Sequence, residues 1–196
     1  MKITEHATAG YRSLLTLDPG IRNAGIALFR GPALILASVV KNPETSGNGP
    51  LACVRMAQRI VATVGCEVDE ILVEWPQVYA TRIRQGVTRE DPNDLIPLAG
   101  VGCALGAMYP RASLQHVRPA EWKGQVPGDA FTARILGRLA QIEVERLAST
   151  LRTDPILHTD RIAALMKHST AHNAIDAVGL GLYKLGRLHR ERVIAR

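Results

Sequence analysis

Three short apolar runs lie within the first 40 residues, and the breaks between them are too short to hold a helix. The runs are 14–18 (LLTLD), 23–29 (NAGIALF) and 33–40 (ALILASVV). Pro19 and Gly20 follow the first run and favour a turn, while the third run contains β-branched residues and no charge. These features predict three antiparallel strands joined as hairpins, so the fold must contain a sheet that begins as a meander.

The rest of the chain alternates between helix-like and strand-like segments. Apolar residues at helical spacing predict a helix over 51–64, and a strand is expected over 70–74. Because this strand is entered from a helix, we expect it to run parallel to its neighbour in the same sheet. The further elements expected are a helix over 94–108 capped by Asp94, a strand over 113–117, a helix over 130–151 with an apolar stripe of Ile135, Leu139, Ile142 and Leu147, and a helix over 170–188.

This order of elements predicts an α/β fold. A five-stranded mixed sheet, with three antiparallel strands followed by parallel ones, is expected to be flanked by helices. No repeat or long linker divides the chain. We therefore expect one domain over 1–196, with a loose leader over 1–12 and a basic tail over 184–196.

Composition narrows the class of protein. The chain has 196 residues, 46% hydrophobic and 21% charged, which excludes bulk disorder. The excess of 24 Lys and Arg over 18 Asp and Glu favours an anionic partner. The three cysteines lack metal-site spacing and indicate reduced thiols. The start has no apolar signal region, and the longest uncharged stretch, 95–110, is too short and too rich in glycine to span a bilayer. We expect a cytoplasmic protein with no membrane contact.

Three acidic residues stand where their carboxylates can converge. Asp18 ends the first predicted strand, Glu74 ends the fourth, and Asp176 lies among apolar residues of the last helix. Taken singly, Asp18 is also typical of a turn and Glu74 of a solvated strand end. His172 and Asn173, four and three residues before Asp176, can share its helix face, either as metal ligands or in a structural hydrogen bond. Taken together, the oxygen ligands are of the kind that Mg²⁺ prefers, and two such ions can clamp a phosphodiester.

These motifs resemble those of the RuvC-type Holliday junction resolvases, which have an RNase H-like fold. The segments LLTLDPGIRNAGIALF, ILVEWPQVY and NAIDAVGLGL resemble the three acidic motifs of that family, over about residues 14–183. The short form with VRPAEWKGQVP looks most like the phage-encoded branch, so the host compartment expected is a bacterial cytoplasm or a phage-infected cell. The resemblance implies a divalent-metal-dependent endonuclease that resolves four-way junctions or other branched DNA by paired phosphodiester hydrolysis.

The resemblance also implies roles for individual residues. Two ions, Mg²⁺ or Mn²⁺, are expected, with Asp18 bridging both, Glu74 holding one and Asp176 the other. The family often has a second acid where Asn173 stands, so either His172 supplies a nitrogen ligand or general base, or Asn173 coordinates through its carbonyl. A histidine ligand favours Mn²⁺, and we favour His172. Hydrolysis by an activated water needs no covalent intermediate.

Cations and one aromatic residue are expected to hold the DNA. Lys123 resembles a family lysine close to the scissile phosphate, and Tyr79 matches an aromatic residue at the junction centre. Phosphate contacts are expected from a basic loop and from the tail, although both are also compatible with solvated surface. The remaining candidates for DNA contact are Arg82, Arg84, Arg89, Lys184 and Arg187.

A homodimer is the expected assembly. Gly102 and Gly106 allow close helix approach, and a two-fold dimer suits the symmetric nicking of a junction. The alternative is that these glycines pack against the sheet of their own chain. Two alternative functions also remain, an RNase H-like nuclease acting on RNA or an RNA–DNA hybrid, and a non-catalytic junction-binding protein.

Overall fold

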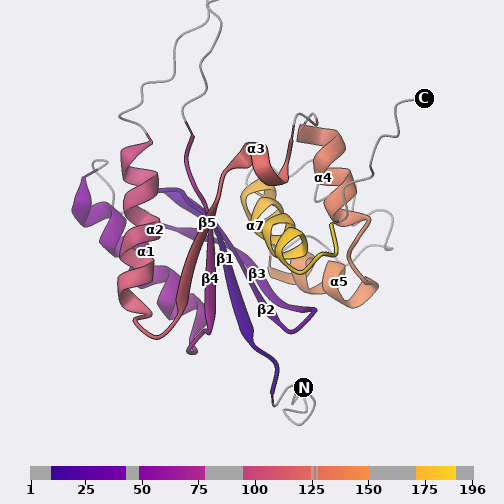
Figure 1. Ribbon diagram of the computed structural model, residues 1–196, viewed down its shortest axis with the longest axis horizontal. Coiled ribbons are helices and arrows are strands. Elements are labelled where there is room, and N and C mark those ends of the chain that lie inside the picture. The colour runs from indigo at the N-terminus through magenta and orange to yellow at the C-terminus, as the bar shows by residue number, and fades with distance from the viewer. Residues whose placement is uncertain are drawn as a thin grey trace, which may run out of the picture.

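A five-stranded sheet forms the centre of the protein (Figure 1). The computed structural model describes residues 10–42, 49–77, 95–124, 126, 128–150 and 171–188. The strands are β1 (Ser13–Asp18), β2 (Asn23–Arg30), β3 (Ala33–Lys41), β4 (Glu70–Glu74) and β5 (Ser113–Val117), in the spatial order β3-β2-β1-β4-β5. The first three strands are antiparallel, and β1, β4 and β5 are parallel. This topology confirms the predicted α/β fold, with a mixed sheet of three antiparallel strands followed by parallel ones.

Helices cover both faces of the sheet (Figure 1). Helices α1 (Pro50–Val64) and α2 (Ile96–Met108) pack together on one face. The other face is covered by α7 (Ala171–Lys184), with α4 (Gly128–Leu136) against α7 and α5 (Gln141–Thr150) against β3. A single turn, α3 (Pro119–Trp122), follows β5.

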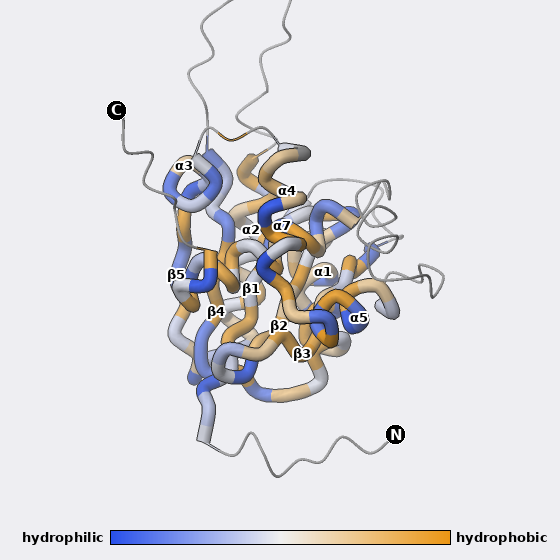
Figure 2. Tube along the Cα trace, turned by 90° about the vertical axis from the view of Figure 1, so that its right-hand side faces the viewer, coloured by the Kyte–Doolittle hydropathy of each residue, from blue (hydrophilic) through white to orange (hydrophobic). Residues whose placement is uncertain are grey.

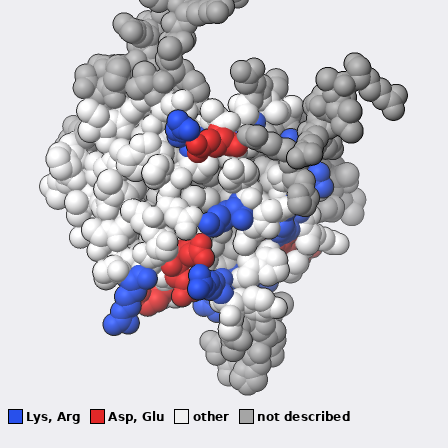
Figure 3. Space-filling model, in the orientation of Figure 1, with Lys and Arg blue, Asp and Glu red and all other residues white. Residues whose placement is uncertain are grey.

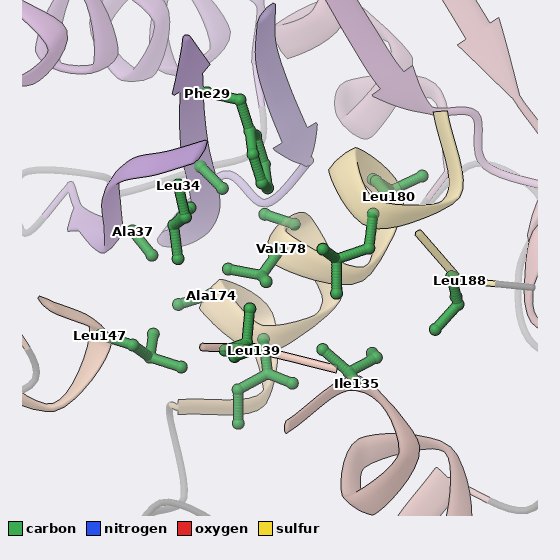
Figure 4. Packing of buried hydrophobic residues seen from close by; sticks show 14 of the residues in the cluster. Phe29, Leu34, Ala37, Ile135, Leu139, Leu147, Ala174, Val178, Leu180 and Leu188 are labelled. Carbon is green, nitrogen blue, oxygen red and sulfur yellow. The ribbon is translucent and has the colours of Figure 1, made fainter. Parts of the chain in front are cut away.

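The two faces are built by the alternation of side chains along each strand. In β1, Leu15 and Leu17 join the core under α1 and α2, whereas Leu14 joins the core under α7. Phe29 and Val178 lie in this second core, at the junction of the sheet and α7 (Figure 4). Figure 2 shows apolar residues running through the central strands. Because both faces are buried, the strands read as nearly continuous apolar runs in the sequence.

The helix predicted over 130–151 is wrong as a single element, because the chain forms α4 and α5 with a break over 137–140. The Glu143 carboxylate accepts a hydrogen bond from the Ala140 backbone amide (2.9 Å) and so caps a new helix start. The new start turns Ile142 outward, with 52% of its surface exposed, and buries Glu143. The other members of the predicted apolar stripe, Ile135, Leu139 and Leu147, are buried.

Two helix ends also differ from the predictions. Helix α2 begins at Ile96 with Leu95 at its N-cap and a proline in the first turn, not with a cap at Asp94. Helix α7 ends at Lys184 rather than 188. Gly186, at φ 70°, adopts a left-handed conformation typical of a residue just past a helix end. Across the described ranges, no helix is both long and apolar enough to cross a membrane.

Candidate active site

Two of the three predicted acids meet because their strands are neighbours. Leu17 of β1 pairs with Val73 of β4 in parallel register. Asp18 and Glu74 are the next residues and the last of their strands. The carboxyl ends of parallel strands lie at one edge of a sheet, which is where open α/β sheets place their ligands.

A buried threonine fixes the third acid beside them. The Thr16 hydroxyl lies 2.6 Å from the Ala177 carbonyl oxygen of α7 and 3.2 Å from that of Ala27 in β2. Ala177 is the residue after Asp176, so this contact sets the position of Asp176 along the sheet. A threonine in an apolar strand gives no sequence signal of such a contact, and our sequence analysis missed it.

Lys123 joins two of the acids directly. Its Nζ lies 2.8 Å from Asp176 Oδ2 and 3.2 Å from Glu74 Oε1. The side chains of Lys123, Glu74 and Asp176 retain 25%, 9% and 22% exposure, so the cluster lies at the base of an opening rather than in the core. The structure therefore brings Asp18, Glu74, Asp176 and Lys123 together.

Burial and mutual repulsion oppose the charges of the acids. Burial is the main cause that raises the pKa of Asp18 well above its ordinary value, followed by the charges of Glu74 and Asp176. Burial also raises the pKa of Glu74, against the opposing effect of Lys123. Burial alone would lower the pKa of Lys123, but the charges of Glu74 and Asp176 outweigh it and raise this pKa. The three acids therefore favour a bound cation.

A cleft opens beside the acids, with a volume of about 180 Å³. Glu74 Oε2 and Gln77 Oε1 are buried and accept no hydrogen bond from any residue that the structure describes. Unpaired buried oxygens of this kind are costly unless another group binds them. The lining residues are Asp18, Pro19, Glu74, Pro76, Gln77, Leu95, Leu98 and Pro119.

The acids match a hard divalent cation in the chemistry of their donors. All are carboxylate oxygens, and Glu74 Oε2 has an unused lone pair facing no described donor. Among the described residues, however, no group of three or more His, Cys, Asp and Glu side chains is already arranged around a metal position. The Lys123 ammonium lies between two of the acids, 3.2 Å from Glu74 Oε1 and 2.8 Å from Asp176 Oδ2. The donor set fits Mg²⁺ or Mn²⁺, with Lys123 as the cation now in place.

His172 and Asn173 lie in the first turn of α7. His172 is exposed, and it has no hydrogen bond or ion pair with residues in the described ranges. The Asn173 amide nitrogen donates to the Asn23 carbonyl oxygen (3.1 Å), which ties this end of the helix to the start of β2. Whether His172 or Asn173 completes a metal site stays a prediction.

Gly25 of β2 explains why the start of α7 can approach the sheet so closely. It pairs with Asp18 in the sheet, and a Cβ at this position would collide with the backbone carbonyl of Asn173. Only glycine allows the start of α7 to rest on β2 here. The second glycine of the first motif thus acts on the site by seating the helix that carries Asp176.

The predicted DNA-contact residues fall into four groups. Lys123 lies in the cluster described above. Lys184 bonds Gln115 (2.6 Å) and lies 3.7 Å from Glu70, the first residue of β4, which places it at the opposite end of that strand from Glu74. Arg187 is held by the buried Glu143 (2.6 and 2.8 Å) and has a role in packing. Tyr79, Arg82, Arg84 and Arg89 lie outside the described residues.

The glycines of α2 face their own sheet. A Cβ on Gly102 would contact Val73, and one on Gly106 would contact Leu114. This supports the alternative of packing within the chain for these two residues. Their small size lets α2 pack close to β4 and β5.

No protein-family model matches the chain, and no curated protein matches it. Three solved structures are similar to it over 89% of its length. Thermus thermophilus RuvC in complex with a Holliday junction substrate has 13% identity and a TM-score of 0.47, with 95% of that chain covered. A second T. thermophilus RuvC structure has 15% identity and a TM-score of 0.44, with 97% covered. Ydc2, the yeast mitochondrial Holliday junction resolvase, has 15% identity and a TM-score of 0.46, with 79% covered.

Proposed function

We propose that the protein is a divalent-metal-dependent endonuclease that cuts branched DNA, with the four-way junction as its preferred substrate. The observation that carries the proposal is the convergence of Asp18, Glu74 and Asp176 at one edge of the sheet, beside a cleft. Three carboxylates that oppose one another's ionisation have a cost in stability. Binding of two cations and a phosphodiester would offset this cost and would account for three carboxylates lying together.

Asp18, Glu74 and Asp176 would hold Mg²⁺ or Mn²⁺ through their carboxylate oxygens. Such ions, when bound, act as Lewis acids on the phosphodiester and make water nucleophilic near neutral pH. By holding the positive charge of the ion next to Asp18, Glu74 and Asp176 would orient a phosphate for attack. Lys123, once free of its carboxylates, has the charge to contact a non-bridging phosphate oxygen. His172, exposed at the start of α7, would act as the general base that takes a proton from water.

Cations at the same end of the sheet support a nucleic-acid substrate. Asn23 at the start of β2 pairs with Lys41 at the end of β3, and the Asn42 amide donates to the Arg22 carbonyl (2.8 Å). Arg22 and Lys41 are both exposed and lie next to the strand that pairs with Asp18. The whole chain has a net charge of +6. Within it, Arg22 and Lys41 are suited to contact phosphates on one side of the acids. The choice of branched DNA follows the motif resemblance described above.

A two-fold dimer is part of the proposal. The sequence of α2 carries no charged residue, and Ile96 on this helix is 67% exposed. Figure 3 shows a broad uncharged area over α2. A second copy bound to this surface would form a two-fold dimer with two active sites, one for each of the two strands that are cut in a junction. The test is the mass in solution, and Ile96→Glu is expected to convert a dimer into monomer.

The test of function is cleavage of a panel of DNA substrates. Purified protein is incubated with a four-way junction, a Y-shaped fork, an RNA–DNA hybrid and a linear duplex, in Mg²⁺ or Mn²⁺. We expect paired symmetric nicks in the junction that are absent with Asp18→Asn and on the linear duplex. Preferred cutting of the RNA–DNA hybrid would show that the substrate is RNA rather than branched DNA. Binding of the junction without cutting in either metal would contradict the nuclease and leave a junction-binding protein.

A further inference from the structure

Lys123 is fixed in place by the turn that precedes it. Its backbone amide donates to the Pro119 carbonyl (2.9 Å), which closes α3. The same turn is capped by the Arg118–Glu121 pair, and Trp122 is buried against Phe131, with ring centroids 5.1 Å apart. The backbone of Lys123 is therefore held by a capped turn that is anchored in the core through Trp122.

The ammonium of Lys123 stands where a cation is needed. It contacts oxygens of both Glu74 (3.2 Å) and Asp176 (2.8 Å), which come from different layers of the fold. Its other near neighbour is the ring of Trp122, 4.8 Å from Nζ to the ring centroid. An aromatic face also attracts a cation, so the surroundings of Nζ favour positive charge on several sides.

One ammonium group neither neutralises the carboxylates of this site nor fills all of their hydrogen-bond acceptors. The ammonium contacts one oxygen of Glu74 and one of Asp176, and the other Glu74 oxygen, Oε2, is buried without a described hydrogen-bond donor. Lysine supplies a single charge and three donors, whereas a divalent ion supplies two charges and accepts six ligands or more. The ammonium and an ion bound between Glu74 and Asp176 would also repel each other at contact distance.

We propose that Lys123 is an internal counter-ion that holds Glu74 and Asp176 together until a divalent ion displaces its side chain from them. This inference rests on the proposed function, because it concerns the same metal site. Binding of the ion and the ion pairs of Lys123 are then mutually exclusive, and each weakens the other by the same factor. The lysine released in this way becomes available to phosphate only when the metal is in place, which links the two events.

The test measures metal binding in the absence of DNA. Mn²⁺ affinity is determined by calorimetry and by electron paramagnetic resonance for wild type, Lys123→Met and Lys123→Arg. Lys123→Met removes the competing charge and keeps the length of the side chain, so we expect Mn²⁺ to bind about tenfold more tightly, or about 1.4 kcal/mol. Lys123→Arg keeps the charge and is expected to stay close to wild type. Lys184→Met, the same change at the far end of β4, is the matched control and is expected to leave Mn²⁺ affinity unchanged.

A second readout separates displacement from a general loss of structure. Without metal, Lys123→Met leaves the carboxylates without their counter-ion, so it is expected to unfold at a lower temperature than wild type and to be stabilised more by Mn²⁺. If Lys123→Met does not fold without metal, Lys123→Gln replaces it in both measurements.

The outcomes distinguish this inference from the proposed function. Equal or weaker Mn²⁺ binding by Lys123→Met, with wild type still binding, would overturn displacement and leave the metal site intact. No Mn²⁺ binding by wild type or by Lys123→Met would overturn the metal site itself.

Discussion

Asp18 is a carboxylate in surroundings that oppose its charge. Its raised pKa means that the folded protein holds this proton at pH values where the unfolded chain has released it. The contribution of Asp18 to stability therefore falls as the pH rises from the ordinary pKa of an aspartate through the raised value. An acid in such surroundings is expected in a site selected for binding rather than for stability.

Asp18→Asn is accordingly expected to stabilise the metal-free protein at pH 8, by about 1 kcal/mol. Thermal unfolding in a chelator measures it, and the gain is expected to shrink as the pH falls toward 4. A lower melting temperature for Asp18→Asn at pH 8 would contradict this account of its environment.

Asp69 is a control for Asp18, because its pKa is shifted in the opposite direction. Hydrogen bonds from the Ser13 backbone amide (2.7 Å) and hydroxyl (2.8 Å) lower its pKa. Its contribution to stability is thus present above the ordinary pKa and lost in acid. We expect Asp69→Asn to lower the melting temperature at pH 8.

At the scale of elements, one contact seats α7 on the sheet. Gly25→Ala places a methyl group against the Asn173 carbonyl, and neither side is a flexible side chain. We expect a loss of about 1–3 kcal/mol in unfolding free energy, as for an overpacked core, together with reduced cleavage. Gly128→Ala has open space around the new methyl group and is the control. Unchanged stability and cleavage in Gly25→Ala would show that α7 is not positioned by this contact.

A second element contact joins α5 to the end of α7. The buried Glu143 accepts bonds from the Leu34 amide (2.9 Å), the Ala140 amide (2.9 Å) and Arg187. Burial opposes its charge, but these bonds outweigh burial and lower its pKa. Its contribution to stability is therefore present above the ordinary pKa of a glutamate and is lost as the pH falls through the lowered value.

Glu143→Gln is expected to cost about 3 kcal/mol at neutral pH, since it breaks a buried ion pair. Chemical denaturation at pH 7 and pH 3 measures the loss, which should be smaller at the lower pH. Glu145→Gln on the same helix should change stability by no more than about 0.5 kcal/mol. An equal loss at both pH values would contradict the role of the Glu143 charge.

The strands were predictable from sequence and some helices were not. Apolar runs with turn signals placed all five strands to within a residue or two, because burial on both faces leaves a strong local pattern. The break between α4 and α5 was missed because it depends on Glu143, whose partners Leu34 and Arg187 are distant in sequence. The short turn α3 was missed because four residues carry no periodicity.

At the scale of the whole molecule, the site gathers residues from both ends of the chain. Strand order brings Asp18 to Glu74, and α7 adds Asp176 from more than 150 residues later. Asp18 and Glu74 were predictable as the ends of predicted strands, whereas Asp176 was predicted from its apolar neighbours and from the resemblance of its segment to a family motif. The ion pairs of Lys123 with two of these acids were not predictable, since they depend on the anchoring of α3 by Trp122.

The central claim is that the three carboxylates act as one site. The most direct measurement is single-turnover cleavage of a four-way junction by Asp18→Asn, Glu74→Gln, Asp176→Asn and their double variants, with Glu67→Gln as a control acid outside the cluster. Residues that act as a unit have strongly non-additive effects. We predict that each single substitution lowers the rate by at least about 10³-fold, and that a second one adds little. Substantial cleavage by Asp18→Asn/Glu74→Gln, or independent multiplying losses, would contradict a shared site.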